Sequence, residues 1–380
     1  MKYNDNWIKA TTFVALLLVS FSQSFGGNPQ RAGQAGASEL LINPWARSSG
    51  LAGSNVASIR GLEGIYSNVA GLAFTQKTEL IFSQTSWLQY GSRMFTADDA
   101  VSTISSFGFS QKVGESGVLG FAVMSMDFGD IEITTVDLPD GGIGTYSPNF
   151  MNMSFSYARI FSNSIYGGAT VKIISEQISN VGASGVALDA GIQYVTGYKD
   201  NLKFGISLKN IGPRMSYAGD GLSFRGIVGD GDDYKMTVEQ RSSELELPAL
   251  LNIGMAYDIN VQRHRITGTG AFTSNSFQKD QYRFGGEYSY REMFMLRLGY
   301  TYEEGLGDLN TSTTALSGPS AGFTIELPMG DSGSTFGFDY SYRDTEPFQG
   351  SHTIGAVSYT HLRAHETRGN LVWRGVVGKK

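Results

Sequence analysis

Residues that could bind a metal ion gather in one stretch of the chain. Asp230, Asp232 and Asp233 lie close together in a long polar segment at 211–246. Clustered carboxylates could hold Ca²⁺, which takes about six to eight oxygen ligands, or they could bridge divalent ions to lipopolysaccharide. A solvated acidic loop explains the same residues more simply. We therefore expect neither a resident metal ion nor a cofactor.

The residues that could support catalysis lack the surroundings that catalysis needs. His264 and His352 lie in strand-like segments without a nucleophile motif, and the glycine-rich run 141–144 does not lie between a strand and a helix. Cysteine is absent, which excludes disulfides, thiolate metal sites and cysteine nucleophiles. The net charge of -6 argues against a nucleic-acid partner. We therefore expect that the protein is not an enzyme.

A further set of charged residues recurs at alternate positions of apolar and aromatic segments. In 282–290, for example, Arg283 and Glu287 share one face, and the tyrosines and Phe284 share the other. This period of two is the signature of a β-strand with one apolar face. Charges of both signs predict an internal ion-pair network, or simple bracing, rather than a pore selective for one sign. The six residues expected on the inner face are Asp189, Lys203, Arg283, Glu287, Arg297 and Asp339.

Fourteen alternating segments follow one another after the first fifth of the chain. Most have a length that suits the roughly 9–11 residues that a tilted membrane strand needs. Only 17% of the residues are charged, against roughly 25% in an average soluble domain. The segments lie near 77–84, 100–113, 116–137, 149–161, 163–177, 185–197, 201–210, 247–259, 262–275, 281–292, 294–304, 316–327, 333–343 and 350–359.

The connections between these segments alternate in length. They are short after even-numbered segments and mostly longer after odd-numbered ones, where 85–99, 138–148, 178–184 and 211–246 are the first four. Outer-membrane barrels show this asymmetry, with short periplasmic turns and longer extracellular loops. The pattern predicts an all-β, closed antiparallel transmembrane β-barrel in the outer membrane, with both barrel ends periplasmic. Its apolar faces would contact lipid, and the charged faces would line the lumen.

The two ends of the chain are predicted to lie outside the fold. Residues 1–26 have a positive start, a short apolar run and small residues near Gly26, which indicates a cleaved signal peptide. The string VSYTHLRAHET at 357–367 resembles one reading frame of a sequencing-library adapter. We therefore expect 357–380 to be a translated adapter tail that is not native, and we give no meaning to the spacing of His361 and His365.

Residues 27–76, between the signal peptide and the barrel at 77–356, do not alternate. They are rich in small residues, which allow close backbone packing, and a fourteen-stranded lumen is wide enough to need filling. We expect a small N-terminal hatch that is inserted into the periplasmic end of the barrel.

Several ordered motifs resemble one known family. The strings ARSSGLAGSNVA at 46–57 and IYSNVAGLA at 65–73 are similar to the opening of the PorV/PorQ family of outer-membrane proteins, and so are FGDIEITT at 128–135 and LKNIGPRM at 208–215. The resemblance spans roughly residues 35 to 356. It marks Asn68, Gly71 and Leu72 as a hatch motif, although Val69 stands where the family tends to have proline.

The resemblance implies a FadL-like barrel with an N-terminal hatch, surrounded by outer-membrane lipid and lipopolysaccharide. It also implies a binding or scaffold role linked to type IX protein secretion, with components of that system as partners. The alternative is a FadL-like passive transporter of hydrophobic small molecules. A transporter predicts an apolar pocket beside the hatch below the outer loops, whereas a scaffold predicts a plugged lumen and an exposed apolar patch on loops such as 211–246 or 85–99.

Overall fold

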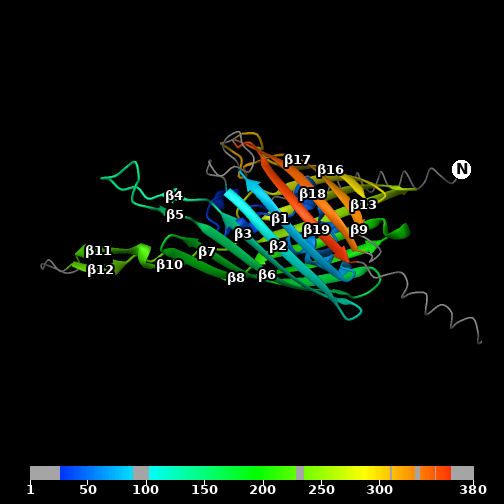
Figure 1. The fold of residues 1–380 in the computed structure, drawn as a ribbon, viewed down its shortest axis with the longest axis horizontal. Coiled ribbons are helices and arrows are strands. Elements are labelled where there is room, and N and C mark those ends of the chain that lie inside the picture. Colours follow the sequence, from blue (N-terminus) through cyan, green and yellow to red (C-terminus); the bar gives the residue numbers. More distant parts are fainter. Residues whose placement is uncertain are drawn as a thin grey trace, which may run out of the picture.

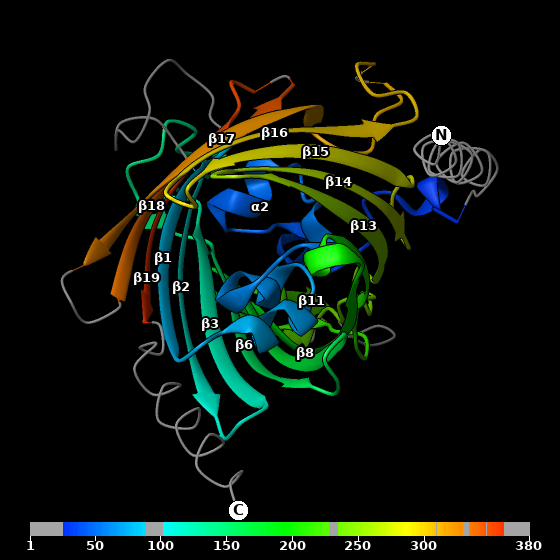
Figure 2. The same cartoon turned by 90° about the vertical axis from the view of Figure 1, so that its right-hand side faces the viewer.

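The barrel is a ring of fourteen antiparallel strands. The computed structural model describes residues 26–88, 102–227, 235–308, 310–329, 334–346 and 348–360. Figure 1 shows the strands crossing the molecule obliquely, and Figure 2 looks into the ring. The barrel strands are β1 (Thr78–Trp87), β2 (Ser102–Val113), β3 (Gly117–Asp127), β6 (Asn149–Ile160), β7 (Ile165–Ile178), β8 (Val181–Thr196), β9 (Leu202–Ile211), β13 (Leu250–Val261), β14 (His264–Asn275), β15 (Gln281–Tyr290), β16 (Phe294–Glu303), β17 (Leu316–Met329), β18 (Ser334–Thr345) and β19 (Ser351–Thr360).

The ring closes because its first and last strands pair. β1 pairs with β2 on one side and with β19 on the other, and Thr78 lies opposite Thr360. Every other barrel strand pairs with the next barrel strand along the chain, so the ring is closed. The fourteen-stranded closed barrel predicted from the alternation is therefore confirmed. Residues 357–360 complete β19, whereas 361–380 and the predicted signal peptide up to residue 25 lie outside the described residues.

The third strand is shorter than the sequence predicts. β3 ends at Asp127 rather than near 137, since Gly129 adopts a left-handed conformation with φ of 73°. The Asp127 carboxylate accepts a hydrogen bond from the Gly129 N–H at 2.9 Å and so closes the turn. The loop that follows projects from the barrel and contains only the two-residue strands β4 (Ile131–Glu132) and β5 (Thr145–Tyr146).

The prediction of a longer loop at 178–184 is wrong. β7 and β8 continue to a two-residue turn at Ser179 and Asn180, and Ser179 has a φ of 53°. The extra length of β8 is paired because β10 (Tyr217–Ala218) lies against its first residues. The segment after β10 contains η7 (Asp220–Leu222) and the projecting hairpin of β11 (Ser223–Ile227) and β12 (Lys235–Glu239) (Figure 1).

Side chains alternate between the two sides of the wall. In β8, Val186, Leu188 and Ile192 are exposed on the outside, whereas Ala187 and Asp189 between them are buried on the inside. The outer face thus presents a band of large apolar residues, which a soluble protein would hide. Among the described helices, none is long and apolar enough to cross a membrane.

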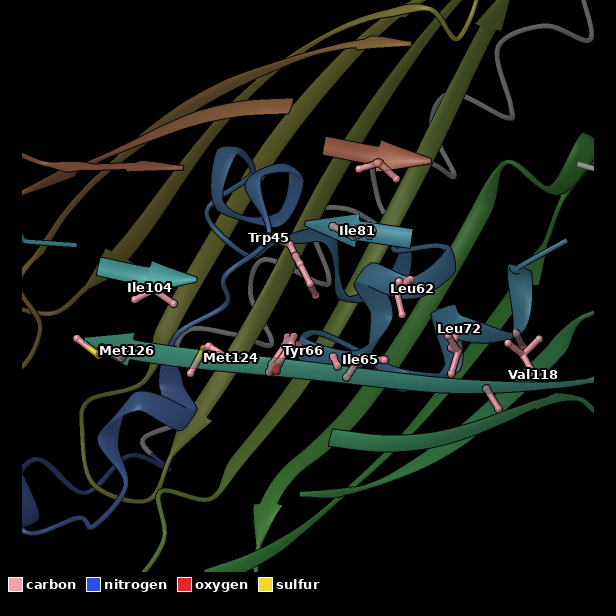
Figure 3. Close-up of a cluster of buried hydrophobic side chains, with 14 residues drawn as sticks. Trp45, Leu62, Ile65, Tyr66, Leu72, Ile81, Ile104, Val118, Met124 and Met126 are labelled. Atoms are coloured by element: carbon pink, nitrogen blue, oxygen red, sulfur yellow. The ribbon is translucent and has the colours of Figure 1, made fainter. Parts of the chain in front are cut away.

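The hatch fills the middle of the ring (Figure 2). It consists of short helical turns, and its apolar side chains pack on one part of the wall. Figure 3 shows Trp45, Leu62 and Leu72 of the hatch beside Ile81 and Met124 of the strands. The helical elements are η1 (Pro29–Arg31), η2 (Ser38–Leu41), α2 (Ala46–Gly50), η3 (Asn55–Ala57), η4 (Gly61–Tyr66) and η5 (Val69–Phe74).

The sequence predicts a hatch inserted into one end of the barrel, but in the structure the hatch extends beyond that end. The Asn28 N–H donates to the Gln278 carbonyl at 3.1 Å, in a connection at the end of the barrel that carries the longer loops. The hatch leaves at Gln76, next to the start of β1 at the opposite, short-turn end. The N-terminal segment therefore threads the whole lumen, since its two ends are anchored at opposite mouths.

Candidate functional site

Two cavities lie on opposite sides of the hatch. The first, about 490 Å³, is lined by residues at the long-loop ends of the strands, such as Trp87, Asn275 and Arg343. The second, about 580 Å³, is lined by residues at the short-turn ends, such as Glu79 and Arg265. We call them the long-loop cavity and the short-turn cavity. Their volumes match those of small-molecule sites, which are typically about 300–1,000 Å³.

One wall of the long-loop cavity is apolar and aromatic. Trp87 at the end of β1, Met126 and Phe128 at the end of β3, and Phe150 in β6 form it. The rings of Phe128 and Phe150 pack edge to face with centroids 4.9 Å apart. Such a wall binds apolar molecules by excluding water from both surfaces.

Other residues that line this cavity are polar and basic. Arg283 donates from Nη2 to the Gln281 side-chain oxygen at 2.7 Å, but its Nε has no hydrogen-bond partner among the described residues. Arg343 lines the same cavity. Within the part of the chain that the structure describes, neither arginine forms an ion pair with a carboxylate. Their guanidinium charges are therefore free to act on a molecule in the cavity.

The short-turn cavity is lined by charges of both signs that pair with one another. Arg297 donates from Nε to Glu287 at 2.6 Å, and Arg265 contacts the other oxygen of Glu287 at 2.9 Å. Lys203 pairs with Asp258 at 2.5 Å. These ion pairs lie together at the short-turn end of the lumen.

Arg47 fixes the hatch to the wall within the same network. This arginine of α2 lies 2.7 Å from Glu326 of β17, 3.0 Å from Asp339 of β18 and 3.3 Å from Glu63 of the hatch itself. Burial raises the pKa of Glu63 to about 8, against the lowering effect of Arg47. The carboxylates around Arg47 raise the pKa of its guanidinium further, although burial opposes them. Arg47 is therefore a charged link between hatch and barrel.

The predicted hatch motif lies at the contact between the hatch and β8. The Asn68 side chain caps η5 by accepting from the Ala70 N–H, and its Nδ2 donates to the carbonyls of Val56 and Ile192 at 3.0 and 3.1 Å. Gly71 packs so tightly that an added Cβ would lie 2.7 Å from the Ile59 carbonyl oxygen. Leu72 is fully buried in the core cluster. These residues shape the hatch and do not line either cavity.

The six charges expected on the inner face are distributed over several places in the structure. Glu287, Arg297, Asp339 and Lys203 belong to the short-turn network, and Arg283 belongs to the long-loop cavity. Asp189 instead pairs with Lys172 at 2.6 Å near the long-loop end.

The remaining candidates are the acidic cluster and the two histidines. Asp230, Asp232 and Asp233 lie outside the described residues. The rings of His264 and His352 exchange hydrogen bonds with tyrosine hydroxyls at 2.7 and 2.8 Å. Across the described ranges, no group of three or more histidine or carboxylate side chains could hold a metal ion.

Sequence analysis did not identify Arg47 as a functional residue, because the hatch has no periodicity that would show which way a side chain points.

Comparisons with solved structures show what the fold is similar to. No protein-family model matches the chain, and no curated protein matches it. The monoaromatic hydrocarbon channel CymD is 12% identical with a TM-score of 0.54, over 86% of this chain and 99% of that one. The toluene transporter TodX of Pseudomonas putida is 14% identical with a TM-score of 0.50, over 80% of this chain and 94% of that one. At such identity the likeness shows the fold alone: a FadL-like fourteen-stranded barrel, while the narrower resemblance to PorV/PorQ receives no support.

Proposed function

We propose that this protein is an outer-membrane channel that lets hydrophobic small molecules pass passively through the membrane. The observation that carries the proposal is the long-loop cavity, whose aromatic wall lies beside the hatch below the loops. A transporter of this kind needs such a pocket. The apolar outer face of the closed barrel supports a position in the outer membrane, with the short-turn end toward the periplasm.

The same cavity favours a cargo with one acidic end over a plain hydrocarbon. Its lining combines the aromatic rings of Phe128 and Phe150 with Arg283 and Arg343, which form no ion pair among the described residues. An arginine binds a carboxylate through two parallel hydrogen bonds, and an unpaired buried cation gains most from such a partner. CymD and TodX, described as channels for monoaromatic hydrocarbons and toluene, support the channel itself.

Uptake by cells that produce the protein tests the proposal. Ala315 lines the long-loop cavity, so Ala315→Trp places an indole there, whereas Glu304→Trp adds the same group to the same connection outside the cavity lining. Cells are supplied with labelled toluene or with labelled benzoate. We expect Ala315→Trp to reduce uptake severalfold and Glu304→Trp to leave it unchanged, with benzoate favoured over toluene. Equal uptake by the two variants and by cells without the protein would contradict the channel.

A scaffold role in type IX secretion is the second candidate. The exposed Phe224, Ile227 and Met236 on the β11–β12 hairpin favour it, since large apolar side chains on a projecting hairpin suit a protein partner. The other loop expected to carry such a patch, 85–99, lies mostly outside the described residues. Affinity purification from the native membrane with mass spectrometry tests this role. Recovery of secretion components, lost in a Phe224→Ser variant, would support it.

A further inference from the structure

Part of the barrel wall at the long-loop end is not made of paired barrel strands. The pairing of β8 with β9 shifts register beyond Ala190 and ends where Leu188 meets Ile211. Further along, β8 has β7 on one side and only the short β10 on the other. The gap between β8 and β13 is covered by two chain segments that a single bridge joins, between Met215 and Leu245. We call this covered gap the seam.

The first part of the hatch, residues 26–42, lies against the seam and is called the arm. Arg31 pairs with Glu246 at 2.7 Å, and the Gly36 N–H donates to the Glu246 carbonyl at 2.9 Å. Ala37 and Leu40 then enter an apolar cluster with the seam residues Met215 and Leu247. The arm also forms part of the long-loop cavity, which it separates from the seam.

A pair of buried acids lies where the arm meets the wall. Glu39 of the arm is 2% exposed, and neither of its carboxylate oxygens has a hydrogen-bond partner among the described residues. The group that acts on it electrostatically is Glu176 of β7, which is 3% exposed. The Glu176 carboxylate in turn accepts a hydrogen bond from the Tyr217 hydroxyl of the seam. Two carboxyl groups in so dry a place cannot both be charged without a large cost.

The cations on β7, β9 and the loops beside the pair are already engaged elsewhere. On β7, Lys172 pairs with Asp189 of β8 at 2.6 Å, and Lys209 of β9 donates to the Tyr66 carbonyl at 2.7 Å. On the loops, Arg214 and Arg31 both bind Glu246. No described cation forms an ion pair with Glu39 or with Glu176. Arg283 and Arg343 line the same cavity as Glu39, but neither is within ion-pair distance of either acid. In this arrangement a proton neutralises the pair.

We propose that Glu39 and Glu176 form a proton-dependent latch that holds the arm against the seam. While the arm is docked, Glu39 carries a proton; once the arm leaves, Glu39 enters water and ionises. The undocked arm would open the long-loop cavity toward the seam, where the pairing of barrel strands is interrupted. The latch would regulate the cavity of the proposed channel, but its existence does not depend on which molecule the cavity takes.

The direction of the pH effect follows from the two states of Glu39. Burial, helped by the Glu176 charge, raises the pKa of docked Glu39 to about 8, while in water the group has its ordinary value of 4.5. The docked state thus binds more protons than the undocked state between these values. Docking is strongest at low pH, weakens about tenfold per pH unit through this window and levels off above it.

Hydrogen exchange of the full-length protein in detergent micelles tests the latch without any cargo. Between about pH 5.5 and about pH 7.5, protection of residues 37–42, corrected for intrinsic rates, should fall by about 100-fold. Glu39→Gln keeps a neutral group in place, so its protection should be high and nearly constant. Glu63→Gln is the matched control, because Glu63 is another buried hatch carboxyl with a raised pKa, and here the fall should persist.

The outcomes are distinguishable from failure to fold and from failure of the proposed channel. Heat-modifiable migration on a gel shows whether each variant forms the barrel. If Glu39→Gln does not fold, Glu176→Gln takes its place. Burial still raises the pKa of Glu39 in this variant, but without the Glu176 charge the fall in protection should be smaller and should level off at a lower pH. The latch is overturned if the arm of the wild-type protein shows no pH dependence, or if the neutral variants keep the full dependence. Either result would overturn the latch without testing the proposed channel, which the uptake experiment tests separately.

Discussion

Replacement of Arg47 by methionine should loosen the hatch from the barrel wall. The guanidinium is the only group of α2 that reaches Glu326 and Asp339 in the described structure, and the side chains involved are between 3% and 17% exposed. Methionine keeps much of the side-chain volume but leaves buried carboxylates unpaired. Removing one partner of a buried ion pair typically costs about 3–5 kcal/mol. Because Glu63 already has a pKa of about 8 and can take up a proton, we expect a loss near the lower limit.

A loss of about 3 kcal/mol corresponds to a roughly 150-fold larger fraction of undocked hatch. Single-channel recording in planar bilayers measures this fraction, because a displaced hatch leaves a wide lumen open to ions. Arg31→Met is the control, since Arg31 also joins the hatch to the barrel through an ion pair, but one whose side chains are about one-third exposed. Such pairs contribute at most about 1 kcal/mol, so its openings should increase no more than about fivefold.

Equal opening frequencies for Arg47→Met and Arg31→Met would refute the reasoning. A second test concerns the charge that Arg47 leaves behind. Asp339→Asn added to Arg47→Met removes one buried charge, so the double variant should open less often than Arg47→Met alone. If it opens more often, the hydrogen bonds of Asp339 matter more than its pairing with Arg47.

Three further substitutions test other contacts. Gly205→Ala should displace the hatch and raise bilayer conductance, because the new Cβ would lie 2.5 Å from the Val56 carbonyl oxygen, whereas Gly268→Ala, with open space around it, should not. Asn68→Ala should lower the protection of the hatch in hydrogen exchange by about 1–3 kcal/mol, since it removes the cap of η5 and the hydrogen bonds to the carbonyls of Val56 and Ile192, of which Val56 keeps Gln193 as a donor. Leu298→Arg should lower the free energy of unfolding in lipid vesicles by about 2–4 kcal/mol, because this exposed side chain faces lipid in the proposed orientation. An unchanged free energy of unfolding would show that the side chain at position 298 faces water.

The barrel was predictable because its signal is local. In a membrane strand one face meets lipid and the other meets the lumen, so the chemistry alternates residue by residue, and segments such as 294–304 match the observed β16 within a residue. The wrong prediction of a loop at 178–184 also follows from relying on a local signal. The small residues Gly182, Ala183 and Ser184 predict a loop, yet they extend β8. Their pairing partners are β7 and β10, and the local sequence does not reveal that β10 lies there.

The contacts between hatch and wall were not predictable from the sequence, because they join residues that are far apart along the chain. Arg47 and Glu326 are 279 positions apart, and the short helical turns of the hatch bury or expose each side chain according to the wall that surrounds it. Glu39 illustrates the same limit, since its sequence neighbours Ser38 and Leu40 give no sign that Glu176 lies beside it. Charged residues on strands could be assigned to the lumen, but the division of the lumen into two cavities depends on the hatch alone.

The two attachments of the hatch differ in the conditions that release them. Arg47 stays charged at any physiological pH, so its link to Asp339 and Glu326 persists as long as those carboxylates are ionised. The arm depends on a proton at Glu39 and on an exposed ion pair at Arg31, which are weaker and sensitive to conditions. Local opening starts where stability is lowest. The arm should therefore undock while α2 remains fixed, so that the long-loop cavity can change shape without opening a continuous aqueous path past the hatch.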